Sequence, residues 1–119
     1  MNIKSMEQAK AYVRNIQCDQ AKELLRKCKG NNKFHIIDTR DREMYKSGHL
    51  KGAILMDVYK YDLSKGLKYL PKDEIYLVYC TAGIRSSEAI SIMQHMGFKH
   101  IYHLEHGLES CNIQEGELV

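Results

Sequence analysis

The residues best suited to covalent chemistry lie in one short stretch, VYCTAGIRSSEA, which spans positions 78–89. An apolar run, IYLVY, ends immediately before Cys80, and Arg85 follows after four intervening residues, Thr81, Ala82, Gly83 and Ile84. A cysteine at the end of a buried strand can be a nucleophile, a metal ligand or a small core residue. The neighbouring residues indicate which of these roles applies.

The loop after Cys80 has the composition of an anion-binding turn. Gly83 permits a positive φ, so successive backbone N–H groups can converge on one negatively charged atom. A helix predicted to begin at Ser86 adds unsatisfied N–H groups and its positive end. Such a cradle stabilises a thiolate and lowers its pKa below the value of about 8.5 of a free thiol. We therefore predict that Cys80 is a nucleophile that has no histidine base next to it.

The side chains of the same loop predict a site for an anionic substrate. Arg85 can bind an anionic substrate or leaving group through its planar guanidinium. Thr81 offers a hydroxyl donor, and Ser86 is expected to cap the helix. Cys80 is the predicted catalytic residue, and the predicted substrate-binding residues are Thr81, Ala82, Gly83, Ile84, Arg85 and Ser86.

The elements that must position this loop alternate along the chain. Apolar and β-branched runs predict strands over 34–38, 52–58, 75–79 and 100–104. Helices are predicted over 5–15, over 19–28 with Asp19 as its cap, and over 86–96 before Gly97, whereas 59–74 is expected to be an irregular surface connection. The alternation predicts an α/β domain with a mainly parallel sheet. Ligands bind outside the carboxyl ends of such strands, where Asp38, Cys80 and Leu104 are expected.

Composition narrows the class of protein. With 119 residues, the chain is long enough for one domain with a core. A net charge of +3, without a basic stripe, gives no reason to expect a nucleic-acid partner. No apolar run approaches the roughly 20 residues of a membrane span, and the N-terminus has no apolar signal segment. We therefore expect a cytoplasmic protein without a membrane partner, whose cysteines are free thiols.

Three segments together resemble the rhodanese family. IIDTRDREMYKSGHLKGAILMDV is similar to the family's first signature, carried here by Asp38, Arg40, Glu43, Tyr45, Gly48, His49, Leu50, Gly52 and Ala53. YCTAGIRSSEA resembles the family's active-site loop, and MGFKHIYHLEHGLESCNIQEGELV resembles its closing segment. The resemblance covers about 16–119, which we predict to be a rhodanese domain, with 1–15 as an N-terminal helical extension.

The resemblance implies a rhodanese-like three-layer fold, with a five-stranded, mainly parallel sheet between helices. It also implies a sulfurtransferase that forms a persulfide on Cys80. The partners would be a small-molecule donor, thiosulfate or a persulfide, and a thiophilic acceptor, cyanide or a small or protein thiol. No metal or organic cofactor is implied. Two alternatives are a rhodanese-fold binding or regulatory module with little turnover, and a phosphatase or arsenate reductase. The latter enzymes place five residues between cysteine and arginine, so the four present here favour sulfur over phosphate.

Some positions depart from the family pattern. Thr81 and Ile84 stand where many members carry basic or polar residues, so Arg85 is the remaining cation of the loop and a persulfide is favoured over thiosulfate as the donor. His106 replaces the first glycine of a common pair. Cys111 replaces a tryptophan, and is either a packing substitution or a thiol that resolves a Cys80 persulfide.

Several other polar residues are expected to support the structure. Asp38, Arg40 and Glu43 are predicted to form a scaffold, because a buried charge needs a partner, and His49 is predicted to be a turn residue with local hydrogen bonds. Cys18 and Cys28 are expected to be helix-start and core residues rather than a redox pair. His100, His103 and His106 recur every three residues. Because the first two are expected on opposite sides of a strand, no metal site is predicted.

Overall fold

The computed structural model describes residues 12–60, 62–112 and 118–119, and a parallel sheet forms its centre. The strands are β1 (Tyr12–Ile16), β2 (Phe34–Asp38), β3 (Ala53–Leu55), β4 (Ile75–Tyr79) and β5 (His100–Leu104). They form one five-stranded sheet in the order β1-β5-β4-β2-β3, and every neighbouring pair is parallel. The predicted α/β class and sheet are confirmed.

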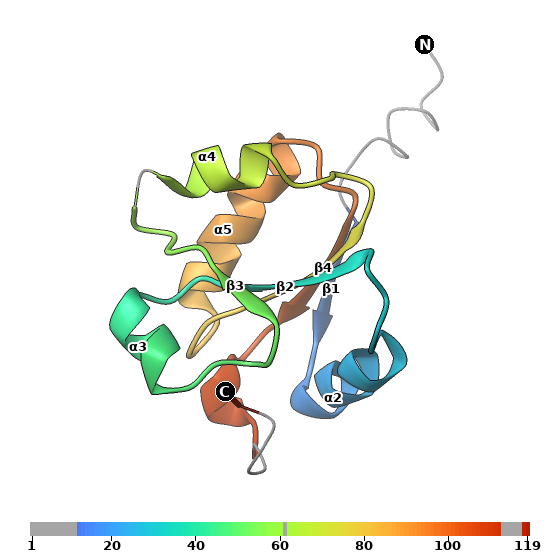
Figure 1. Ribbon diagram of the computed structural model, residues 1–119, viewed down its shortest axis with the longest axis vertical. Helices are drawn as coiled ribbons and strands as arrows, with labels where there is room; N and C mark the ends of the chain where they lie inside the picture. Colours follow the sequence, from blue (N-terminus) through green and yellow to red (C-terminus); the bar gives the residue numbers. More distant parts are fainter. Residues whose placement is uncertain (1–11, 61, 113–117) are drawn as a thin grey trace.

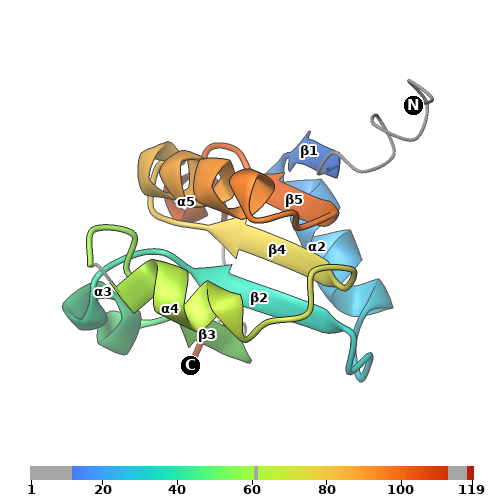
Figure 2. The same ribbon diagram turned by 90° about the horizontal axis from the view of Figure 1, so that it is seen from above.

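Helices cover both faces of this sheet. They are α2 (Cys18–Lys27), α3 (Arg42–Ser47), α4 (Asp62–Lys68), α5 (Ile84–His95) and the 3₁₀ helix η1 (Leu108–Ser110). In Figure 1, α4 and α5 lie above the strands, and α2 and η1 lie below them. Figure 2 views the molecule from the side of α4 and α5, with β4 visible between the two helices. The expected three layers are therefore present.

Two cores follow from the alternation of side chains along the strands. Ile37 of β2 packs with the buried side chains of α4 and α5, whereas Ile36 packs on the other side with Ala21 of α2. The central strand β4 contributes to both clusters, Tyr76 and Val78 to the first and Leu77 and Tyr79 to the second. A strand buried on both faces needs an unbroken apolar sequence, which explains IYLVY.

Some predicted elements were wrong. Residues 12–15, expected in a helix over 5–15, belong to β1, which pairs with β5 at the edge of the sheet; the other residues of that prediction, 5–11, lie outside the described part. The expected strand over 52–58 is reduced to β3. The expected irregular connection contains α4, whose Leu63 and Leu67 are buried against α5. The division into 1–15 and 16–119 stays a prediction, although the sheet already includes residues 12–15.

The start of α2 also differs from the prediction. Gln17, not Asp19, is the N-cap residue, and the backbone N–H of Gln17 donates to Oε1 of Gln20 over 2.8 Å. Asp19 lies in the first helical turn, where its charge still complements the helix dipole. None of the helices in the described ranges is long and apolar enough to cross a bilayer.

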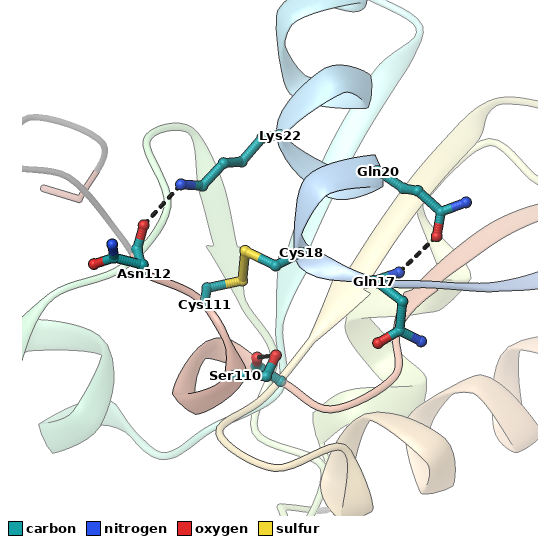
Figure 3. The surroundings of a disulfide bond; sticks show 8 residues. Gln17, Cys18, Gln20, Lys22, Ser110, Cys111 and Asn112 are labelled. Atoms are coloured by element: carbon teal, nitrogen blue, oxygen red, sulfur yellow. Dashed lines mark hydrogen bonds between the residues drawn. A yellow bond between two sulfur atoms is a disulfide. The ribbon is translucent and has the colours of Figure 1, made fainter.

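A disulfide joins the start of α2 to the residue after η1. Cys18 and Cys111 are bonded across a sequence separation of 93 residues, with their Cα atoms 5.3 Å apart (Figure 3). Nearby, Lys22 Nζ donates to the carbonyl of Asn112 over 2.7 Å. The expectation of four free thiols was therefore wrong, because the fold brings two distant segments together. Cys28 and Cys80 are the free thiols. While the bond is intact, Cys111 has no thiol with which to resolve a persulfide.

Candidate active site

Cys80 lies directly after β4, at the carboxyl end of the central strand, and is 2% exposed. Its backbone is held on the side of η1, because the N–H of Leu108 donates to the Cys80 carbonyl over 2.9 Å and the N–H of Glu109 to the Thr81 carbonyl over 3.0 Å. The thiol is thus fixed beyond the carboxyl ends of the strands, where a parallel sheet places its ligands.

The loop curls around the sulfur of Cys80 as predicted. The backbone N–H groups of Gly83 and Ser86 donate to Sγ over 3.0 and 3.4 Å, and the Ser86 hydroxyl lies 3.3 Å from it. Burial alone raises the pKa of the Cys80 thiol, but the hydrogen bonds from Ser86, Gly83 and the Ala82 backbone outweigh it and bring the pKa below the ordinary value. The cradle therefore favours a thiolate.

Two glycines allow the loop to pack against the segment after β5. Gly83 has φ +101°, and a Cβ there would lie 2.0 Å from the carbonyl oxygen of Glu105. Gly107 has φ +71°, and a Cβ there would lie 2.1 Å from the carbonyl oxygen of Thr81. The cradle and the segment 105–107 therefore touch through their backbones, without room for a side chain at either glycine.

Ser86 has a different place from the one predicted. Helix α5 begins at Ile84 with Gly83 as its N-cap residue, so Ser86 lies inside the first turn and does not cap it. Its hydroxyl instead lies 2.7 Å from Nε2 of His103, whose Nδ1 is 3.0 Å from Oδ1 of Asn15. The sequence did not indicate this contact, because His103 lies on β5. Only the fold places β5 beside β4, so that His103 comes close to the cradle. A histidine is thus one hydroxyl away from Cys80, although none was expected.

The other loop side chains lie around the rim of the cradle. Arg85 has its guanidinium 4.8 Å from the ring centroid of Tyr59, and its Nη1 lies 3.8 Å from Oδ2 of Asp41. Ile84 is 68% exposed and Ala82 is also exposed. The Thr81 hydroxyl oxygen is buried and has no hydrogen-bond partner among the residues that the structure describes.

Comparison with known proteins identifies the family. The sequence model of the Rhodanese-like domain matches residues 19–113. The chain belongs to the rhodanese-like family. A solved structure described as "rhodanese with anions from E. coli" is 29% identical, has a TM-score of 0.58, and the match covers 72% of this chain and 96% of that one.

Two curated relatives of this rhodanese-like domain are longer proteins. A tRNA uridine(34) hydroxylase of Buchnera aphidicola subsp. Acyrthosiphon pisum (strain Tuc7) is 35% identical over an alignment of 97 residues, and the match covers 78% of this chain and 29% of the relative. A probable adenylyltransferase/sulfurtransferase MoeZ of Mycobacterium tuberculosis (strain CDC 1551 / Oshkosh) is 34% identical over 76 residues, which are 64% of this chain and 19% of the relative. The chain thus spans less than a third of either relative.

The first rhodanese signature forms a buried polar network beside the site. Asp38, fully buried, accepts from Arg40 Nη2 over 2.8 Å and from the Tyr79 hydroxyl over 2.7 Å. Arg40 also donates to the Gly48 carbonyl over 2.6 Å, and Tyr79 accepts from the Leu50 N–H over 3.1 Å. These contacts join β2, β4 and the loop before β3, which suits the predicted supporting role of Asp38 and Arg40.

The other polar residues considered in the sequence include His49, which makes local contacts, and Glu43 and His100, which are exposed to solvent. His49 Nδ1 lies 2.7 Å from the Tyr45 carbonyl, and its ring stacks on that of Tyr45, so the predicted local hydrogen bond is present. Glu43 is exposed on α3. His100 is exposed and His103 is buried, as expected for opposite sides of β5.

Proposed function

We propose that this protein is a sulfurtransferase that carries a sulfane sulfur as a persulfide on Cys80. The observation that supports this most is the convergence of the Gly83 and Ser86 backbone N–H groups, which flank Arg85 in the sequence, on Sγ of Cys80. Backbone donors that point at one sulfur stabilise the thiolate before attack and release it as a good leaving group afterwards. The sulfurtransferase in the name of the MoeZ relative supports the same class of chemistry.

The proposed reaction has two displacements. The Cys80 thiolate attacks the outer sulfur of thiosulfate, the S–S bond of the donor breaks, and sulfite leaves with the bonding electron pair. A cyanide or thiolate acceptor then attacks the outer sulfur of the Cys80 persulfide, and the Cys80 thiolate leaves. No outside oxidant or reductant is needed, because the sulfane sulfur changes partners in both steps. A persulfide donor follows the same scheme with a thiolate as the leaving group.

The rim of the cradle favours a donor less charged than thiosulfate. Arg85 shares its charge with Asp41, 3.8 Å away, and lies over the Tyr59 ring. Ile84 and Tyr59 are 68% and 61% exposed. A thiosulfate dianion gains little from an arginine that is already partly paired, whereas an organic persulfide or a protein thiol gains apolar contact with these side chains. We therefore propose an organic persulfide donor and a thiol acceptor.

The proposal is tested by mass spectrometry of the intact protein after incubation with a sulfane donor. In a Cys28→Ser background, which removes the other free thiol, we expect one added sulfur, about 32 Da, located on Cys80, and no addition when Cys80→Ala is combined with it. The series of donors should include thiosulfate and glutathione persulfide. If none of them adds sulfur to Cys80 of the folded protein, the proposed transfer is wrong, and a binding or regulatory module becomes the better account. In a separate assay, release of phosphate from a phosphate ester, or of arsenite from arsenate, would instead indicate the phosphatase or arsenate reductase alternative.

A further inference from the structure

A continuous chain of polar atoms leads from the cradle to the edge of the sheet. Sγ of Cys80 lies 3.3 Å from Oγ of Ser86, and the same oxygen lies 2.7 Å from Nε2 of His103. The other ring nitrogen, Nδ1, lies 3.0 Å from Oδ1 of Asn15 on β1. Ser86 is fully buried and His103 is 5% exposed, so bulk water does not take the place of these partners.

One arrangement of hydrogens satisfies all of these contacts when Cys80 is a thiol. The amide oxygen of Asn15 accepts a hydrogen bond, so Nδ1 of His103 carries a proton and Nε2 is left as an acceptor. The Ser86 hydroxyl then donates to Nε2, and its oxygen accepts from the Cys80 S–H. The hydroxyl also lies 3.1 Å from the Gly83 carbonyl, which accepts as well from the hydroxyl and the backbone N–H of Ser87. The Ser86 proton therefore has two acceptors within reach, and the contact with His103 is the shorter one.

The same heavy-atom positions also suit the thiolate. If the thiol proton moves to Oγ of Ser86 while the Ser86 proton moves to Nε2 of His103, one S–H bond and one O–H bond break, and one O–H bond and one N–H bond form. The imidazolium then donates to Ser86, and Ser86 donates to the thiolate. Every polar group keeps a partner, and no side chain has to move. We propose that His103 accepts the proton of Cys80 through Ser86 and so sets the pH at which the nucleophile forms.

The surroundings of His103 agree with a base that is neutral before the reaction. Burial lowers the pKa of His103 and His106 reinforces this effect, whereas Glu105 and the Gly83 backbone carbonyl oppose it. On its other sides, β1 presents the uncharged Asn15, and α5 presents Ser86 with the Cys80 thiol behind it. A neutral imidazole is the form that can accept a proton. Because His103 acts through Ser86 and does not touch the sulfur, it is a positioning residue rather than a catalytic one.

This inference rests on the proposed role of Cys80 as a nucleophile, but it is tested without any sulfur donor. The rate of Cys80 alkylation by iodoacetamide is measured against pH in a Cys28→Ser background, since Cys28 is the second free thiol. His103→Gln keeps polar atoms near the position of Nε2 but cannot take up a proton. We expect its thiolate to form at higher pH by about one unit, so that alkylation near pH 6.5 is about tenfold slower. Above the pKa of an ordinary thiol, about 8.5, the two rates should converge.

Three further variants separate proton transfer from packing. His100→Gln, on the same strand but exposed, is the matched control and should leave the profile unchanged. Asn15→Asp places a carboxylate on Nδ1, which stabilises the imidazolium, so its thiolate should form at lower pH than in the unmodified chain. In Ser86→Ala, the His103→Gln substitution should cause no additional shift, because the connecting hydroxyl is gone. Circular dichroism confirms that each variant is folded.

The outcomes distinguish the inference from the proposed function. If folded His103→Gln and Asn15→Asp both give the unmodified alkylation profile, or if the His103→Gln shift persists in Ser86→Ala, His103 does not act through Ser86. If the alkylation profiles shift as expected but no donor adds sulfur to Cys80, the relay exists and sulfur transfer is wrong.

Discussion

The buried Asp38–Arg40 pair gives a quantitative test of the network beside the active-site loop. Asp38 is fully buried and Arg40 is 6% exposed. The Asp38 carboxylate accepts from the Arg40 backbone N–H and guanidinium and from the Tyr79 hydroxyl, over distances of 2.7 to 3.1 Å. Asp38→Ala would leave the guanidinium and the Tyr79 hydroxyl in the interior without that acceptor.

The expected loss of stability follows from these contacts. Removing one partner of a buried ion pair costs about 3–5 kcal/mol, which is a large part of the roughly 5–15 kcal/mol that stabilises a domain. Asparagine has the same shape as aspartate and retains one acceptor oxygen. The loss of stability in Asp38→Asn should therefore be nearer that of a charged hydrogen bond, about 1.5–3 kcal/mol.

Urea unfolding of the two variants measures both values, with the denaturant slope used to check that the unfolding transition is unchanged. Glu23→Gln, which removes an exposed ion pair with Arg26, is the matched control and should shift the midpoint little. A supporting role also predicts that folded Asp38→Asn keeps the alkylation profile of Cys80. A loss below about 1 kcal/mol for Asp38→Ala would refute the estimate for a buried, unpaired arginine, and a changed alkylation profile would give Asp38 a role at the sulfur.

Other parts of the structure give further predictions. Cys18→Ser removes a disulfide across a separation of 93 residues and should lower the free energy of unfolding by about 2–4 kcal/mol. Equal urea midpoints for the unmodified chain with and without reductant would contradict this. In Gly83→Ala, the new Cβ would meet the Glu105 carbonyl and displace the cradle, so alkylation of Cys80 at neutral pH should slow, and an unchanged rate would argue against the cradle. The pKa of Cys80 is lower in the folded state, so between that pKa and about 8.5 the unfolded chain binds more protons. Stability relative to Cys80→Ala should therefore rise with pH across this window and be lost as pH falls through the folded-state pKa; a flat difference in unfolding free energy would contradict the lowered pKa.

The sequence predicted the parts of the fold that depend on local pattern. The strands over 34–38, 75–79 and 100–104 have the predicted bounds, because strands of a parallel sheet are short apolar runs. β1 was mistaken for a helix because it is an edge strand in which Tyr12, Arg14 and Asn15 are exposed, so the apolar signal of a strand is weak. Helix α4 was missed because its buried residues, Leu63 and Leu67, lie in a charged and glycine-containing stretch.

The candidate site was predictable only where it is contiguous in the chain. The segment after Cys80 has a short-range signal, and its Gly83 and Ser86 N–H groups do donate to the sulfur. The contact from Ser86 to His103, the Cys18–Cys111 bond and the pairing of Arg85 with Asp41 join segments that are distant in sequence. Such contacts arise from strand order and helix placement, which one sequence without its fold does not display.

Persulfide formation on Cys80 is tested by the mass of the intact protein after exposure to a persulfide donor. The measurement uses the folded chain with Cys28→Ser, so that Cys80 is the free thiol, and peptide fragmentation locates the adduct. A sulfurtransferase should show one added sulfur on Cys80, its removal by cyanide with formation of thiocyanate, and no adduct when Cys80→Ala is combined with Cys28→Ser. An unmodified Cys80 in folded protein, with every donor of the series, would contradict it.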